Sequence, residues 1–207
     1  MRRYLLITVG LIAFTMAILF ASLVRHALVE AIRMRTYGRL SYLRVALANY
    51  EYAHGVLPPR QLADENGGVQ FNWLVPVLPY IEQGDLHSDL DLSSSWDSPH
   101  NLAIAQSNSS FLDFITRDSY IACPLDDQES IWNPLTGLPR GQLNESPSSI
   151  ALIAVPMNGI RLFEPFAISK DELRDVALNG KQSFFIRSDG KCGFVQVANG
   201  SIEFTVP

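Results

Sequence analysis

The sequence predicts an α+β protein in which one long N-terminal helix packs on an antiparallel sheet. The first fifty residues contain no proline and keep a helical apolar spacing, whereas the C-terminal half has short β-rich runs between turn residues. These patterns divide the chain into a membrane anchor at 1–25, a soluble half-helix at 26–57 and an α+β domain at 58–207.

Residues 4–24, called the apolar span below, carry no charge. At about 1.5 Å per residue, a helix of this length crosses a hydrocarbon core of about 30 Å. A cleaved signal peptide is shorter and ends in a small-x-small site, which Ala21-Ser22-Leu23 lacks. The apolar span is therefore predicted to be a single-pass anchor whose partner is the lipid bilayer, with a cleaved signal or a buried core helix as alternatives.

Charge divides the chain into two parts. Up to Arg44 there are seven arginines and one acidic residue, whereas nine basic and twenty acidic residues follow from Val45 onward. The acidic body argues against nucleic acid as a partner. The arginines after the apolar span outnumber Arg2 and Arg3, so the positive-inside rule alone would place the body in the cytoplasm.

The helical pattern continues beyond the apolar span. Gly55 and the pair Pro58-Pro59 predict that the helix ends near His54. The face predicted to pack on the sheet carries four residues: Leu40, Leu43, Leu47 and Tyr50.

The middle of the chain predicts short elements. Residues 60–70 read as a polar loop, and residues 71–83, cut by two prolines, read as a short helix or an irregular core piece. Pro99, preceded by Asp97 or Ser98 as the cap, predicts a helix start, and the polar stretch 107–110 ends that helix.

The C-terminal half predicts strands at 120–123, 150–156, 182–187, 193–197 and 201–206. Between the last two, Asn199-Gly200 predicts a tight hairpin, because both residues tolerate positive φ.

The sequence contains no catalytic motif, and the histidines are scattered, so we expect no enzyme, no catalytic residue and no cofactor. His100 follows a helix-opening proline, which favours packing or exposure over catalysis. The tryptophans Trp73, Trp96 and Trp132 are typical of a core rather than of a ligand groove.

Two acidic clusters are candidate metal sites. In one cluster a carboxylate or imidazole stands at every second position, at Asp85, His87, Asp89 and Asp91. The Gly and Glu of an EF-hand loop are missing there. A solvated strand or loop face is the favoured interpretation there, and equally for the cluster at Asp126, Asp127 and Glu129. No metal ligand is therefore assigned.

The two cysteines, Cys123 and Cys192, lack metal-ligand spacing. A disulfide and two buried free thiols remain equal alternatives, because pairing requires a short Cα separation that the sequence cannot supply.

Several pieces, in order, resemble a pilin-like family of unknown function that is abundant in planctomycetes and similar to type II secretion pseudopilins. They are residues 37–59 (YGRLSYLRVALANYEYAHGVLPP), 73–83, 96–102, 122–126, 164–173 and 193–204. The resemblance implies a pilin-like fold and a body outside the cytoplasmic membrane, against the arginine count.

The chain departs from that family in two places. No Glu stands near the start of the apolar span, and the family's C-terminal His, nine residues, Asp-Gly signature becomes Asp189, nine residues, Asn199-Gly200. The resemblance implies a structural or assembly role in a secretion or surface apparatus, with other pilin-like subunits as partners. The missing Glu, which sets subunit register in pilins, favours the alternative of a tethered binding module that does not polymerise.

Overall fold

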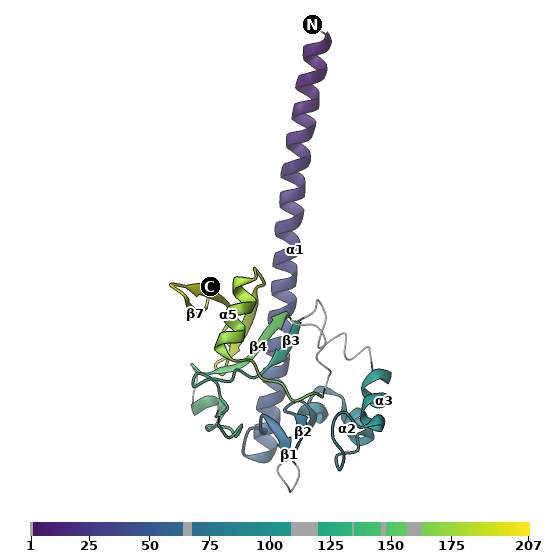
Figure 1. Cartoon of the computed structure of the whole chain (residues 1–207), viewed down its shortest axis with the longest axis vertical. Coiled ribbons are helices and arrows are strands. Elements are labelled where there is room, and N and C mark those ends of the chain that lie inside the picture. The colour runs from purple at the N-terminus through teal and green to yellow at the C-terminus, as the bar shows by residue number, and fades with distance from the viewer. Residues whose placement is uncertain (1, 64–67, 109–119, 134, 146–147, 157–162) are drawn as a thin grey trace. The chain divides into compact units, whose positions relative to one another are not determined.

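The computed structural model describes the whole chain except residues 1, 64–67, 109–119, 134, 146–147 and 157–162 (Figure 1). The chain separates into two compact units, Met1–Arg35 and Thr36–Pro207, which are considered one at a time below.

A single helix, α1 (Arg2–His54), makes up the described part of the first unit and continues into the second. It ends as predicted at Gly55, whose φ of 75° places it in the left-handed region and whose N–H donates to the carbonyl of Glu51 at 2.7 Å. A glycine meets this requirement without strain because it has no Cβ.

The second unit is built on a five-stranded antiparallel sheet. Its strands are β3 (Tyr120–Cys123), β4 (Ile150–Pro156), β5 (Ser183–Arg187), β6 (Cys192–Ala198) and β7 (Ser201–Thr205), in that spatial order. All five predicted strands are present. The β6–β7 hairpin is also confirmed: Asn199 and Gly200 have φ of 52° and 78°, and Ala198 pairs with Ser201.

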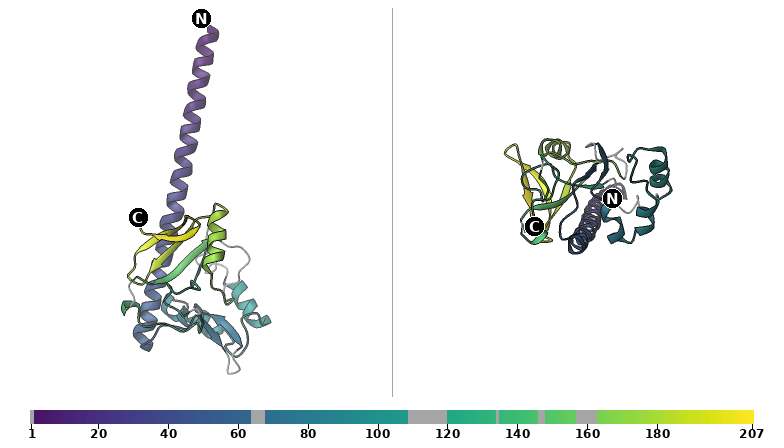
Figure 2. Two further views of the ribbon diagram at one scale, coloured as in Figure 1. Left: turned by 60° about the vertical axis from the view of Figure 1, so that its left-hand side comes forward. Right: turned by 90° about the horizontal axis from the view of Figure 1, so that it is seen from below.

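The sheet is covered on both faces (Figure 2). On one face Leu152, Ala154, Phe184 and Ile186 form a core with Leu40, Leu43 and Leu47 of α1, all of them at most 3% exposed. On the other face Ile153, Val155 and Phe185 pack with Leu173 of α5 (Lys170–Leu178). β4 is buried on both faces, which explains its continuous apolar sequence.

The predicted helix face is confirmed for the three leucines, and Tyr50 packs half-buried against the same core while its ring also makes two aromatic contacts. Its ring stacks on His54 at 4.2 Å between centroids and meets the edge of Tyr80 at 5.6 Å. Tyr80 belongs to the 3-10 helix η1 (Val75–Ile81), so the last turns of α1 contact that segment.

The predicted polar loop at 60–70 is wrong in part. β1 (Gln61–Ala63) and β2 (Val69–Asn72) form an antiparallel hairpin there, and β2 includes Phe71, at the start of the segment expected to be a short helix or an irregular piece. The short helix itself is present as η1. It is followed by α2 (Gly84–Asp89), which the sequence did not predict.

Three further helices lie in the described part of the unit. α3 (Pro99–Ser107) begins as predicted, with the Ser98 hydroxyl accepting from the N–H of Asn101 at 3.3 Å, and η3 (Leu143–Glu145) is a single turn. α5 begins with a capping box, in which the Ser169 hydroxyl accepts from the N–H of Glu172 and the Glu172 carboxylate accepts from the N–H of Ser169.

Candidate membrane anchor and surface hollows

The side chains of α1 from Val9 to Val24 are exposed on every side of the helix. Phe14, Phe20 and Leu23 are 65%, 69% and 69% exposed. Leaving a large apolar side chain in water forgoes about 1.5–3 kcal/mol, so this surface requires a lipid or protein covering. The helix is long and apolar enough to cross a membrane.

The hydroxyl of Thr15 illustrates how the apolar span tolerates polar side chains. Its Oγ1 donates to the carbonyl oxygen of Ile12 at 2.9 Å, so the hydroxyl proton is satisfied within the helix. Threonine can therefore lie within an apolar span at little cost.

A basic segment, residues 25–35, follows the apolar span. Arg25 and Arg35 are exposed, and Arg33 lies 3.2 Å from Glu30 in an ion pair within the helix. Glu30 is the one acidic residue of this segment, which therefore keeps a positive charge.

Arg44 has a different role because it is part of the folded second unit. Its Nε donates to the carbonyl oxygen of Ser188 at 2.7 Å, and its guanidinium lies against Gly190 in the β5–β6 turn. Gly190 has a φ of 88°, and a Cβ there would contact the guanidinium at 3.6 Å. This arginine holds α1 to the sheet.

Two adjoining hollows lie where α1 ends. The apolar hollow, of about 430 Å³, is lined mainly by Val56, Leu57, Pro59, Leu138 and Pro139. The polar hollow, of about 380 Å³, is lined by Arg44, Ala48, Glu51, Tyr52 and Leu143, and the two share Gly55 and Gln142. Tyr52 is 94% exposed and Val56 60%, so an amphipathic partner would find apolar and charged groups side by side here.

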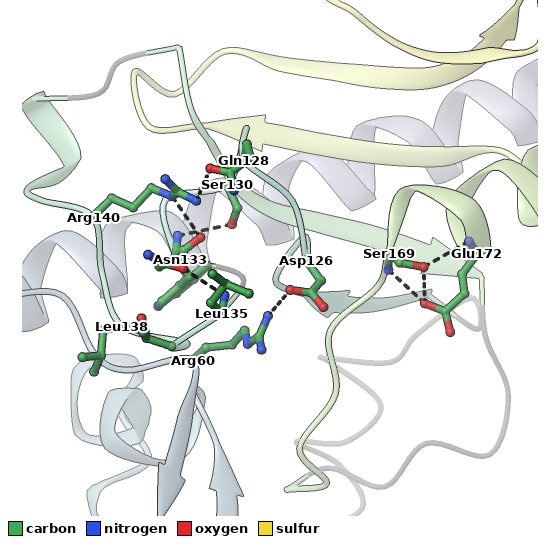
Figure 3. A network of polar contacts seen from close by, with 12 residues as sticks. Arg60, Asp126, Gln128, Ser130, Asn133, Leu135, Leu138, Arg140, Ser169 and Glu172 are labelled. Carbon is green, nitrogen blue, oxygen red and sulfur yellow. Dashed lines mark hydrogen bonds and ion pairs between the residues drawn. The ribbon is translucent and has the colours of Figure 1, made fainter.

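Hydrogen bonds fix the loop that supplies half of the apolar hollow (Figure 3). The N–H of Asn133 donates to the carbonyl of Leu138 at 2.8 Å, and the N–H of Arg60 donates to Gly137 at 2.8 Å. Arg140 donates from Nη2 to Gln128 at 2.8 Å and from Nε to the carbonyl of Trp132 at 3.3 Å. These bonds hold residues 137–140, at the edge of the hollow, to residues 60, 128 and 132.

The acidic cluster at Asp126, Asp127 and Glu129 is paired with cations. Arg60 binds Asp126 (Figure 3), and Nζ of Lys170 lies 3.1 Å from Asp127 and 2.8 Å from Glu129. Although partial burial opposes it, hydrogen bonds to Glu129 and Asp127 raise the pKa of Lys170. These pairs join the start of α5 to the 126–129 loop.

The other acidic cluster is not the strand or loop face that alternation predicted. Asp85, His87 and Asp89 lie on α2, where alternate residues point about 200° apart. Asp91 lies beyond the helix and accepts hydrogen bonds from Ser93 and Ser94, which lower the pKa of its carboxyl. In the part of the chain that the structure describes, no three His, Cys, Asp or Glu side chains gather as metal ligands.

The aromatic residues lie largely in the core, as predicted. Trp132 is fully buried and its Nε1 donates to the carbonyl of Pro58 at 2.9 Å, while Trp73 lies beside it at 6.3 Å between centroids. Trp96 is half-buried. His100 is exposed and its Nε2 hydrogen-bonds the carbonyl of Asp89 at 2.9 Å, which ties α3 to α2.

Cys123 and Cys192 are free thiols. They lie on β3 and β6, with β4 and β5 between them, and their side chains belong to opposite faces of the sheet. Three strand spacings of about 4.8 Å far exceed the reach of a disulfide. This separation excludes the pairing that the sequence left open.

The sequence does not predict the two hollows. Their walls come from residues 44–59 and 138–143, which are far apart in the chain, so no local pattern marks them. A partial signal is Leu138, an apolar residue in a turn-rich loop that lines the apolar hollow.

Comparison with protein families gives a match over much of the chain. The model of a family described as a protein of unknown function (DUF1559) matches residues 31–157, from the second half of α1 to the end of β4. No curated protein and no solved structure matches the chain.

Proposed function

The chain belongs to the DUF1559 family, whose function is unknown, and we propose that it is a membrane-anchored protein with a structural or assembly role outside the cytoplasm. In this proposal the apolar span crosses the cytoplasmic membrane, the body works in contact with other pilin-like subunits, and the protein catalyses no reaction.

The two parts of α1 carry the proposal. In the second part Leu40, Leu43 and Leu47 are at most 1% exposed in the core of the body. In the first part every described side chain from Val9 to Val24 is exposed although nearly all are apolar. One continuous helix whose first part lies in the hydrocarbon layer and whose second part lies in the folded core would attach the body to the membrane.

The arginines after the apolar span oppose the proposed orientation. Five of them follow the apolar span, and positive-inside counting would place the body in the cytoplasm. The pairing of Arg33 with Glu30 does not change that count, because acidic residues contribute little to the rule. The outward orientation is proposed on the resemblance to pilin-like proteins.

Orientation can be tested by adding protease to cells that carry the full chain, after their outer layers have been removed and while the cytoplasmic membrane is intact. The proposal predicts that the body is digested while a fragment containing the apolar span survives in the membrane. A body that is digested only after the membrane is opened would contradict the proposed orientation.

The assembly role can be tested with a photo-cross-linking residue in place of Phe14, in native membranes. An assembling subunit should give adducts with the mass of two pilin-like subunits, because the apolar helices would lie in contact. The control carries the same photo-cross-linking residue in place of Lys181, which is exposed on the body. Monomer alone at both positions would contradict assembly.

The second candidate function, a tethered binding module that does not polymerise, is favoured by the adjoining hollows. The apolar hollow offers Val56 and Leu138 to a partner, and Arg44 and Glu51 line the polar hollow beside it. A monomeric protein in membranes that still binds a partner, and that loses it on Val56→Asp substitution, would support this alternative.

A further inference from the structure

We propose that the basic segment, residues 25–35, begins in the headgroup layer of the membrane, extends just beyond it, and attracts the phosphates of anionic phospholipids. This inference rests on the proposed function, because it assumes that the apolar span is in the bilayer. It adds a specific partner, the anionic lipid, which anchoring alone does not require.

The placement of the arginines along α1 supports this proposal. Arg25 follows the apolar span directly, so its guanidinium would lie at the depth of the lipid phosphates. At about 1.5 Å per residue, Arg33 and Arg35 are about 12 Å and 15 Å further along the helix axis. The headgroup layer is about 5–7 Å thick, so both lie within roughly one Debye length, about 8–10 Å, of its outer edge.

The angular positions of the three arginines around the helix axis also fit a membrane surface. At about 100° per residue, Arg33 and Arg35 lie about 80° to either side of Arg25. Between them the apolar residues Leu28 and Val29 are 58% and 45% exposed. At the end of a membrane-spanning helix, exposed apolar side chains can lie toward the acyl chains while nearby arginines extend their guanidiniums to the phosphates.

The acidic body does not share the attraction of the basic segment to anionic lipids. From Val45 onward twenty acidic residues face nine basic ones, so an anionic membrane repels the body as a whole. The basic segment has three arginines and one acidic residue, Glu30, which pairs with Arg33. On the body side of the apolar span, the basic segment is therefore the part of the chain that complements an anionic lipid surface, whereas Arg2 and Arg3 flank the other end of the span.

The test uses the full chain in bilayers that contain phosphatidylcholine and phosphatidylglycerol. Spin-labelled lipids report how strongly each headgroup is enriched next to the protein. Since each arginine near an anionic surface contributes roughly fivefold, we expect the unmodified chain to prefer phosphatidylglycerol by about fivefold or more. The preference should fall toward one in high salt.

Two triple variants of the basic segment and a matched control in the body test whether the lipid preference depends on the basic segment or on the total charge of the chain. The variant R25Q/R33Q/R35Q should lose most of the preference, the remainder being due to Arg2 and Arg3, whereas R25K/R33K/R35K should keep most of it because its charge is unchanged. The matched control R174Q/K181Q/K191Q removes the same charge from the body and should keep the preference.

The proposal is overturned if the unmodified chain shows no preference, or if the glutamine variant of the basic segment retains it. All variants should remain in the bilayer after an alkaline wash, since the apolar span is unchanged. Release of the unmodified chain by that wash would instead overturn the proposed anchoring itself.

Discussion

The guanidinium of Arg44 donates from Nε to the carbonyl oxygen of Ser188 at 2.7 Å and thereby fixes α1 to the turn between β5 and β6. These residues are far apart in the chain, and their contact lies beside the core formed by Leu43, Leu47 and the sheet. The helix that carries the apolar span is in this way part of the folded body.

We expect Arg44→Met to destabilise the body by about 1–2 kcal/mol, because a hydrogen bond from a charged donor is lost and the Ser188 carbonyl loses its partner. Chemical unfolding of the full chain in detergent measures the change in the free energy of unfolding. Lys181→Met, at an exposed position, is the matched control and should change the unfolding free energy little. Equal effects of the two substitutions would contradict the role assigned to Arg44.

Leu43→Ala should destabilise the body by about 2–5 kcal/mol, since Leu43 is 1% exposed and its removal leaves a cavity between α1 and the sheet. Leu19→Ala removes the same atoms from a side chain that is 61% exposed and should leave the unfolding of the body unchanged. The same unfolding measurement applies to both. A large effect of Leu19→Ala would show that the apolar span packs on the body.

Phe14→Arg should weaken membrane retention, because an arginine near the middle of a spanning helix costs roughly 2.5–3.5 kcal/mol. The measurement is the fraction of the chain that stays with membranes after an alkaline wash. Tyr52→Arg, at a position of the body that is 94% exposed, is the control and should be retained like the unmodified chain. Full retention of the Phe14 variant would count against the apolar span as the anchor.

The cysteines should alkylate slowly in the folded chain. Burial raises the pKa of the Cys123 thiol far above its ordinary value, and partial burial raises that of Cys192. A raised pKa means less of the reactive thiolate at neutral pH, so the rate should keep rising with pH beyond the ordinary thiol range. Cys123 should react only after unfolding, and a disulfide between the two in native protein would contradict the separation of β3 and β6.

Elements with a local chemical cause could be predicted from the sequence. Asn199-Gly200 set the β6–β7 hairpin through their tolerance of positive φ, Gly55 ended α1, and Ser98-Pro99 started α3. The capping box at Ser169 and Glu172 is a signal of the same kind and could have predicted α5.

The elements that were missed depend on contacts distant in sequence. α2 is only six residues long and buries Leu86 as its core contact, so the alternation of Asp85, His87 and Asp89 read as a strand or loop. The hollows exist because Val56 and Leu138 are brought together by the fold, and the ring of Tyr50 meets Tyr80 for the same reason. Local patterns carry no information about such contacts.

The most direct test of a retained membrane anchor is the intact mass of the protein extracted from alkaline-washed native membranes. We expect the protein to stay in the membrane fraction, with a mass that includes residues 4–24. A soluble protein whose N-terminus lies beyond Leu23 would contradict a retained anchor, because the apolar span would then be a removed signal.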